Sequence, residues 1–176
     1  MADPPREEYL ERRYRERMSA SDLVSFRVRI RETDLLVLAQ HDLSQEARRA
    51  ARRARTTLEA WIEGCPEFAR TLAPLPCPPY APRLVRDMCA AAQAARVGPM
   101  AAVAGAIAEF VARELEPHSP EVIVENGGDA YLMGSRERVA AVFAGWSPLS
   151  TASRSSCPVI ASRSRYAPPP PPWGRR

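Results

Sequence analysis

Hydrophobic and polar side chains alternate across residues 26–31, where each apolar residue is followed by an arginine (FRVRIR). This period of two is typical of a strand with one buried face. A short polar segment, residues 32–34, separates it from the apolar run 35–39 (LLVLA), which predicts a second and more buried strand. The folded part of the chain is therefore predicted to begin with two strands.

A helical period replaces this alternation over residues 44–64. Apolar side chains recur on one face: Ala47, Ala51, Ala54, Leu58, Trp61 and Cys65. Arginines fill the other faces, and Asp42 or Ser44 can cap the start of the helix. The proline-rich stretch 66–82 predicts a loop. A second amphipathic helix follows over residues 84–92 and is predicted to end near Gly98.

Residues 97–114 (VGPMAAVAGAIAEFVARE) predict a third helix made largely of small apolar residues. Pro99 suits its first position, because the missing N–H would have no intrahelical partner there. A helix that is apolar on all sides is expected to be buried. Gly105 predicts a close approach by another element, so we expect Gly105→Leu to disrupt folding.

The β-branched run 122–124 and the turn signal Asn126-Gly127-Gly128 predict a hairpin that continues into residues 130–134. The same turn can instead serve as a loop of bare backbone beside a ligand, with Asp129 as its carboxylate. A further strand is predicted at about 138–144. The order of two strands, then helices, then strands favours an α+β fold.

Four stretches carry a resemblance to a known family: ETDLLVLAQHDL (32–43), PEFARTLAPL (66–75), VGPMAAVAGAIAE (97–109) and VENGGDAYL (124–132). Together they resemble the uncharacterised ApbE-like family of bacteria and archaea, a distant relative of the flavin transferase ApbE. The resemblance covers roughly residues 14–148. It implies a T-fold-like, ApbE-type α+β domain, with a mostly antiparallel sheet packed against helices, over residues 19–148 after a charged leader, 1–18.

The resemblance also implies a cofactor site for FAD or FMN. Its predicted residues form two segments: Gly98, Pro99, Met100, Ala101, Ala102 and Gly105 in the third helix, and Asn126, Gly127, Gly128 and Asp129 in the turn. A phosphate is expected at the helix N-terminus, where backbone amides are free. Where ApbE has a lysine-bearing GGIAKG-like sequence, this chain has AAVAGA, and the later Asp/Thr metal element is missing. Magnesium is therefore expected only in a full-length relative, and no catalytic residue is assigned.

Charge and composition narrow the classes of partner. The formal net charge of +4 comes from 25 basic residues, all of them arginine. Acidic residues are interleaved with the arginines and aromatic residues are few, so solvated helix faces are favoured over a nucleic-acid interface. No stretch has the ~20 apolar residues of a membrane span, and the N-terminus lacks the apolar segment of a secretion signal. A cytoplasmic location is expected.

Several polar and aromatic residues receive structural interpretations. The four cysteines, at positions 65, 77, 89 and 157, contain no C-x-x-C motif, so reduced and mostly buried thiols are expected and no metal site is predicted. Thr33 and Asp34 are interpreted as capping a turn, with ligand contact as the alternative. His41 and His118 are expected on the surface. Trp61 and Phe68 are expected to anchor the core.

The composition changes after residue 148, where a Ser- and Arg-rich segment leads to five consecutive prolines, 168–172. One interpretation is a disordered polyproline II tail over residues 149–176. The favoured hypothesis is a frameshift near residue 148, because an alternative reading frame can encode a VCTSS-type motif resembling the family's next one. The C-terminal part of the domain would then be missing, and the DNA sequence beyond this point tests the hypothesis.

Three hypotheses about function stay open from the sequence. The chain is an ApbE-like enzyme that acts on FAD or a related nucleotide; a non-catalytic, flavin- or nucleotide-binding accessory protein in redox or sulfur metabolism; or the inactive product of a frameshifted gene. Binding of FAD without FMN transfer to a target Thr favours the second. The sequence does not identify the ligand, and a homo-oligomer stays open.

Overall fold

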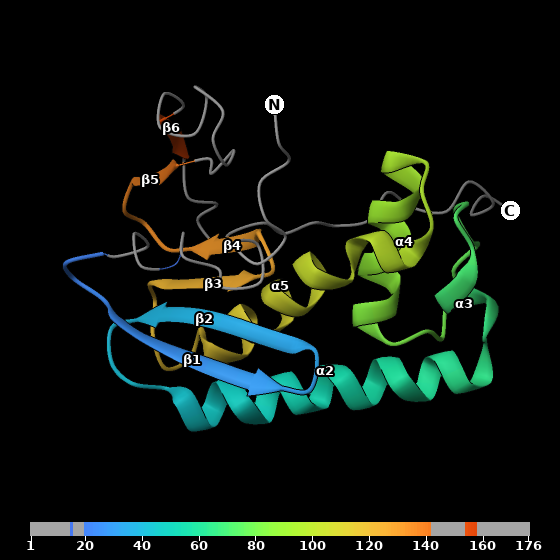
Figure 1. Cartoon of the computed structure of the whole chain (residues 1–176), viewed down its shortest axis with the longest axis horizontal. Helices are drawn as coiled ribbons and strands as arrows, with labels where there is room; N and C mark the ends of the chain where they lie inside the picture. The colour runs from blue at the N-terminus through green and yellow to red at the C-terminus, as the bar shows by residue number, and fades with distance from the viewer. Residues whose placement is uncertain (1–14, 16–19, 142–153, 158–176) are drawn as a thin grey trace, which may run out of the picture.

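The computed structural model describes residues 15, 20–141 and 154–157. Its main sheet has four strands: β1 (Val24–Ile30), β2 (Thr33–Ala39), β3 (Val122–Asn126) and β4 (Asp129–Met133). The strands lie in the order β1-β2-β3-β4, and every neighbouring pair is antiparallel (Figure 1). The predicted α+β class with an antiparallel sheet is therefore confirmed. The T-fold and the ApbE-type topology stay predictions.

Register explains which strand residues are buried. Val28 pairs with Leu35, and Val37 pairs with Val124, so that apolar side chains of three strands share one face. All four of these side chains are fully buried. Because successive strand residues point to opposite faces, the arginines of β1 lie on the other side of the sheet.

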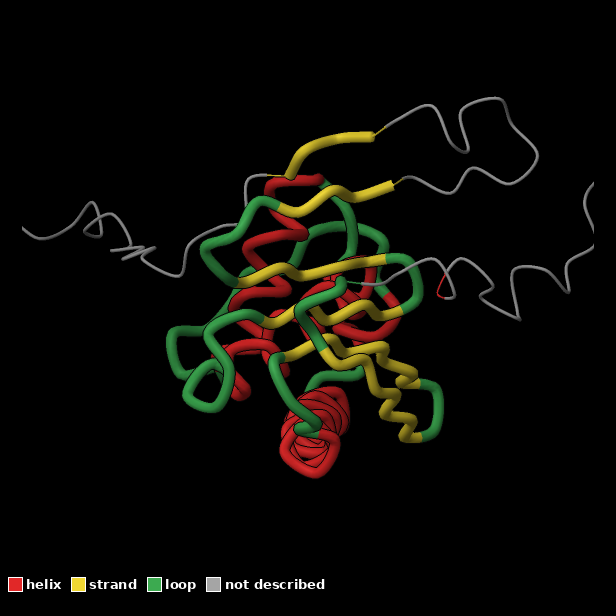
Figure 2. Tube along the Cα trace, turned by 90° about the vertical axis from the view of Figure 1, so that its left-hand side faces the viewer, coloured by secondary structure: helices red, strands yellow, loops and turns green. Residues whose placement is uncertain are grey.

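Four helices and one 3-10 turn pack with the sheet: α2 (Ser44–Gly64), α3 (Glu67–Arg70), α4 (Arg83–Ala95), η2 (Pro99–Ala102) and α5 (Val103–Leu115). α2 contacts β1 and α5, and α5 contacts β3 and β4. Figure 2 looks along α2, which is seen end-on below the strands of the sheet. The core therefore lies between one face of the sheet and the pair α2 and α5.

The predicted helix 44–64 is confirmed, but its start differs from the prediction. Neither Asp42 nor Ser44 occupies the N-cap position, which belongs to Leu43 and carries no side-chain cap. The Asp42 carboxylate instead accepts a hydrogen bond of 2.9 Å from the Ser44 backbone N–H, just before the helix. Asp42 thus closes a short turn that leads into α2.

The proline-rich stretch 66–82 contains a helix that the sequence analysis missed. α3 follows Pro66 directly, and it buries Phe68 to 2% exposure. The Phe68 ring meets the ring of Trp61 edge to face, with centroids 6.5 Å apart. Phe68 is confirmed as a core anchor, whereas Trp61 is only partly buried.

The third predicted helix is neither continuous nor buried on all sides. It begins as η2 and becomes α-helical at Val103. Five residues of its C-terminal half are buried, whereas Ala101 is exposed and residues 102–106 are half-buried. The prediction of complete burial is wrong because neither α4 nor β4 covers the small residues at the start of α5, which line an open pocket instead.

Residues near the C-terminus form a second, two-stranded sheet. β5 (Arg138–Ala141) pairs antiparallel with β6 (Arg154–Cys157). The other residues of the segment 149–176, and the leader 1–18 except Arg15, lie outside the described residues. The frameshift hypothesis for this region stays a prediction.

Within the described part of the chain, no single helix is long and apolar enough to cross a membrane. The bent pair Arg83–Ala95 and Pro99–Leu115 meets the length and composition limits together, with an angle of 107° between its members.

Candidate functional site

A cavity of about 350 Å³ lies where α4, α5 and the start of β4 meet. Its lining is made of small residues and carboxylates: Asp87, Ala91, Ala102, Gly105, Ala106, Glu109, Asp129 and Ala130. The volume is at the lower end of the range for small-molecule sites. We call this cavity the α4–α5–β4 pocket.

Three of the predicted cofactor residues, Ala102, Gly105 and Asp129, line the pocket together. A Cβ atom placed on Gly105 would lie 3.6 Å from Oδ2 of Asp129, which is an ordinary van der Waals distance. Gly105 is therefore not at a close-packed interface, so the reason for expecting Gly105→Leu to disrupt folding is not supported. A side chain at this position would enter the pocket instead.

The hairpin turn positions Asp129. Gly127 and Gly128 have φ angles of 64° and 105°, which glycine adopts far more readily than other residues. Asn126 pairs with Asp129 across this two-residue turn. The Asn126 side-chain N–H₂ group donates a 3.0 Å hydrogen bond to the Ala104 carbonyl, which ties the hairpin to α5. Asn126 is thus predominantly buried and holds the turn rather than lining the pocket.

Two acidic residues of the lining, Asp87 on α4 and Glu109 on α5, were not predicted from the sequence. Loss of solvent around Asp87 raises its pKa, and the neighbouring Glu109 carboxylate raises it further. Arg113 forms an ion pair with Glu109 at 2.6 Å and lies 5.8 Å from the centroid of the Tyr131 ring. Asp87 and Glu109 come together only because α4 packs against α5, and no local sequence pattern predicts that contact.

Gly98, which precedes η2, and residues 99–101 of η2 lie outside the lining, as do Asn126, Gly127 and Gly128. Gly98 and Pro99 are buried, Met100 packs against the core, and Ala101 is exposed. A Cβ atom on Gly98 would lie only 1.9 Å from the carbonyl oxygen of Thr71. The close backbone approach that was expected at Gly105 is therefore at Gly98. The phosphate site at this helix start stays a prediction.

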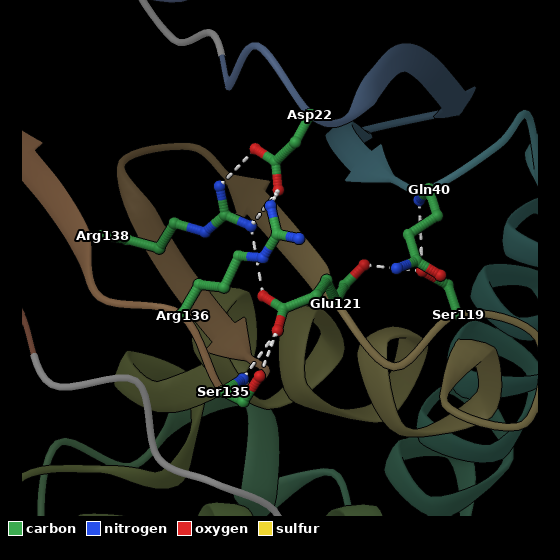
Figure 3. Close-up of polar contacts among 7 residues, drawn as sticks. All are labelled: Asp22, Gln40, Ser119, Glu121, Ser135, Arg136 and Arg138. Atoms are coloured by element: carbon green, nitrogen blue, oxygen red, sulfur yellow. Dashed lines mark hydrogen bonds and ion pairs between the residues drawn. The ribbon is translucent and has the colours of Figure 1, made fainter.

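A separate polar cluster joins the start of β3 to the segment before β5 (Figure 3). Glu121 is 6% exposed and accepts hydrogen bonds from the backbone N–H and the hydroxyl of Ser135, at 2.7 and 2.9 Å. Arg138 bridges Glu121 and Asp22, while Arg136 pairs with Asp22 as well. The carboxylates and guanidinium groups satisfy one another, as a structural network requires.

Ser119, drawn in the same view, accepts a hydrogen bond from the Gln40 backbone N–H at 3.2 Å and donates one to the Glu121 carbonyl at 2.6 Å (Figure 3). It joins the end of β2 to the start of β3. The cluster thus holds three segments of the chain together at one end of the sheet.

Thr33 and Asp34, predicted to cap a turn, contact arginine side chains in the structure. Asp34 is 7% exposed and its carboxylate accepts hydrogen bonds from Arg15 and Arg27. The hydroxyl of Thr33 contacts the Arg55 guanidinium at 2.9 Å. Arg27 and the other neighbouring charges hold the pKa of Asp34 well below its usual range.

Cysteines and histidines were considered as metal ligands or nucleophiles. Cys65 and Cys77 are half-buried and Cys89 is buried, as expected, and all three are free thiols. Burial raises the pKa of Cys89 to about 12, so its thiol is a poor nucleophile at neutral pH. Among the described residues, no three His, Cys, Asp or Glu side chains gather as a metal site would require. His41 and His118 are exposed, as predicted.

Comparison with known proteins identifies similar sequences. The model of the family described as AbpE bacteria matches residues 15–160. A UPF0280 protein of Methanocella arvoryzae is 40% identical over 121 residues, which cover 68% of this chain and 49% of that protein. A UPF0280 protein of Methanosarcina acetivorans is 38% identical over 122 residues, covering 68% of this chain and 48% of the relative.

A third relative, a UPF0280 protein of Methanococcus aeolicus, is 35% identical over 130 residues, which are 73% of this chain and 52% of that protein. This chain therefore spans about half the length of the curated relatives it matches.

Proposed function

The chain belongs to the family described as AbpE bacteria, and on this basis we propose that it binds a flavin nucleotide, FAD or FMN, in the α4–α5–β4 pocket. The observation that carries the proposal is the meeting of Gly105 and Asp129 across the cavity, since both belong to the segments that resemble flavin-binding elements. The pocket lies on the part of the chain that matches the family.

The small residues of the lining support a flat ligand. Ala102 at the end of η2 and Gly105 and Ala106 in α5 are small residues that face the pocket, so one wall of the cavity lies close to the helix backbone. An aromatic ring can lie against such a wall without displacing a side chain. The volume of about 350 Å³ suits part of a dinucleotide rather than all of FAD.

The acidic lining supports one orientation of that ligand. Carboxylates accept hydrogen bonds and repel phosphate oxygens. Asp87, Glu109 and Asp129 therefore favour the flavin ring and its ribityl hydroxyls inside the pocket, with the phosphates directed to solvent. Contacts on one side of the ligand give weak binding, so we expect a Kd for FAD of ~100 µM or weaker, equivalent to about −5 kcal/mol.

Fluorescence titration with FAD, FMN and ADP tests this orientation. FAD and FMN are expected to bind with similar affinity, because both carry the ring. ADP lacks the flavin ring and is expected to bind at least about tenfold more weakly, a difference of about 1.4 kcal/mol. Equal affinity for ADP and FAD would contradict the proposal, as would failure of both flavins to bind at millimolar concentration.

Gly105→Leu tests the location of the site. The leucine side chain is expected to fill the pocket and to weaken FAD binding by at least about tenfold. The matched control is Gly64→Leu at the exposed end of α2, where an added Cβ meets nothing within 4 Å. Both variants are expected to retain the far-UV circular dichroism of the parent protein. Parental affinity in a folded Gly105→Leu variant would place the site elsewhere.

A further inference from the structure

Glu125 connects the hairpin turn of the pocket to a basic residue near the N-terminus. Its side chain is 2% exposed and lies on the face of the sheet opposite Val124, which belongs to the core. A carboxylate so deeply buried is stable only when its charge is paired and its oxygens are hydrogen-bonded.

Each oxygen of the Glu125 carboxylate has a different partner. Oε1 accepts a 2.7 Å hydrogen bond from the Gly128 backbone N–H. Oε2 accepts a 2.6 Å hydrogen bond from Nε of Arg15. One carboxylate therefore joins the turn to the N-terminal arginine.

Arg15 is itself fixed by more than one contact. Its side chain is 10% exposed, and Nη1 lies 3.0 Å from Oδ1 of Asp34. Nη2 donates a 2.6 Å hydrogen bond to the Asp34 carbonyl. All three guanidinium nitrogens are used, so the planar group is held in one orientation against both acidic residues.

We propose that Arg15 is a positioning residue for the pocket: it holds the Glu125 carboxylate so that Glu125 fixes the Gly128 amide and thereby the place of Asp129. The expected effect of Arg15 on ligand binding rests on the proposed function, whereas its expected effect on the hairpin turn does not. The residue after Gly128 is the one that meets Gly105 in the pocket.

Replacing Arg15 by methionine tests the proposal, because methionine keeps an apolar stem and removes the guanidinium. Without the guanidinium, the Glu125 carboxylate loses the hydrogen bond and the charge of Arg15, so its position beside the Gly128 amide is less fixed. We expect amide hydrogen exchange at Gly128, measured by NMR, to become about tenfold faster, while amides of β2 keep their protection. FAD affinity should fall about fivefold through the displaced Asp129.

Arg27→Met is the matched control, because Arg27 donates hydrogen bonds to the Asp34 carboxylate, 2.7 Å from Nε, and acts on Glu125 as a neighbouring charge. Arg27→Met should leave amide exchange at Gly128 unchanged. If loss of any positive charge on this face were enough, exchange at Gly128 would become faster in this variant as well. Arg15→Lys keeps the charge and should restore protection at Gly128 in part. If the methionine variant fails to fold, Arg15→Lys alone decides: its Gly128 exchange must exceed that of the parent.

Two outcomes separate this inference from the proposed function. Unchanged exchange at Gly128 in folded Arg15 variants overturns the positioning role, whatever the ligand affinity. Faster exchange at Gly128, with no flavin binding by any form including the parent, supports the positioning role and contradicts the proposed function instead.

Discussion

Gly98→Ala is expected to lower the free energy of unfolding by about 3 kcal/mol, because the added methyl group must displace backbone rather than a side chain. The new Cβ would lie 1.9 Å from the carbonyl oxygen of Thr71 and 2.8 Å from its carbonyl carbon. Thr71 follows α3 directly, so relief of the overlap must move α3 or η2. Urea unfolding followed by circular dichroism measures the change.

Gly105→Ala is the matched control for this loss, because both changes add one methyl group seven residues apart in the same segment. At Gly105 the nearest neighbour is Asp129 at 3.6 Å, so no overlap arises. Alanine in a helix interior is more favourable than glycine by about 0.5–1 kcal/mol. We therefore expect this variant to be at least as stable as the parent. Equal stability of the two variants would contradict the assigned roles of the two glycines.

Acidification is expected to destabilise the folded chain between about pH 5 and pH 2. The Arg138 side chain lowers the pKa of Asp22 to about 2, and the neighbouring arginines lower the pKa of Asp34 further. Hydrogen bonds from Ser135 and Arg138 outweigh burial and lower the pKa of Glu121 as well. A carboxyl group whose pKa is lower in the folded state stabilises that state above its unfolded pKa of about 4. The contribution is lost as the pH falls toward the folded pKa.

Thermal unfolding at pH 6.5, 4.5 and 3 measures this loss as a falling Tm. Asp34→Asn should lower the Tm at pH 6.5 and reduce its dependence on pH, because one of the titrating groups is gone. Asp87→Asn is the control with the opposite sign, since the pKa of Asp87 is raised in the folded protein. A Tm that does not change from pH 6.5 to pH 3 would contradict this account.

Much of the secondary structure follows from local patterns in the sequence. The alternation in residues 26–31, the apolar face of α2 and the Asn-Gly-Gly turn each act over a few residues, and each element is present in the structure. α3 was missed because the prolines around it dominate the composition. Pro66 nonetheless precedes its first residue, a position where proline is compatible with a helix start.

The packing roles of Gly98 and Gly105 could not be predicted from the local sequence. A glycine among alanines suggests close packing, yet the backbone approach occurs at Gly98, where the chain after α3 returns. That approach depends on the tertiary path of residues 66–82. Similarly, Asp34 looked like a turn residue because its partner Arg15 is distant in sequence.

The pocket was predicted only in part, because some of its residues come together through tertiary packing. Gly105 and Asp129 were both expected at a ligand site, and they meet because β4 packs against α5. Asp87 and Glu109 enter the lining through the packing of α4 against α5, a contact between two amphipathic helices that local patterns do not specify.

The antiparallel order of the sheet also has a consequence for the route by which the chain folds. The pairs β1–β2 and β3–β4 are each joined by a short turn, so each can form as a local hairpin. The pairing of β2 with β3, such as Ala39 with Val122, must close a loop of about 80 residues that contains every described helix between them. Its entropic cost exceeds that of a two-residue turn by about 3 kcal/mol. The pairing of β2 with β3 is therefore expected to form late and to limit the rate of folding, after α2 and α5 have docked against each other.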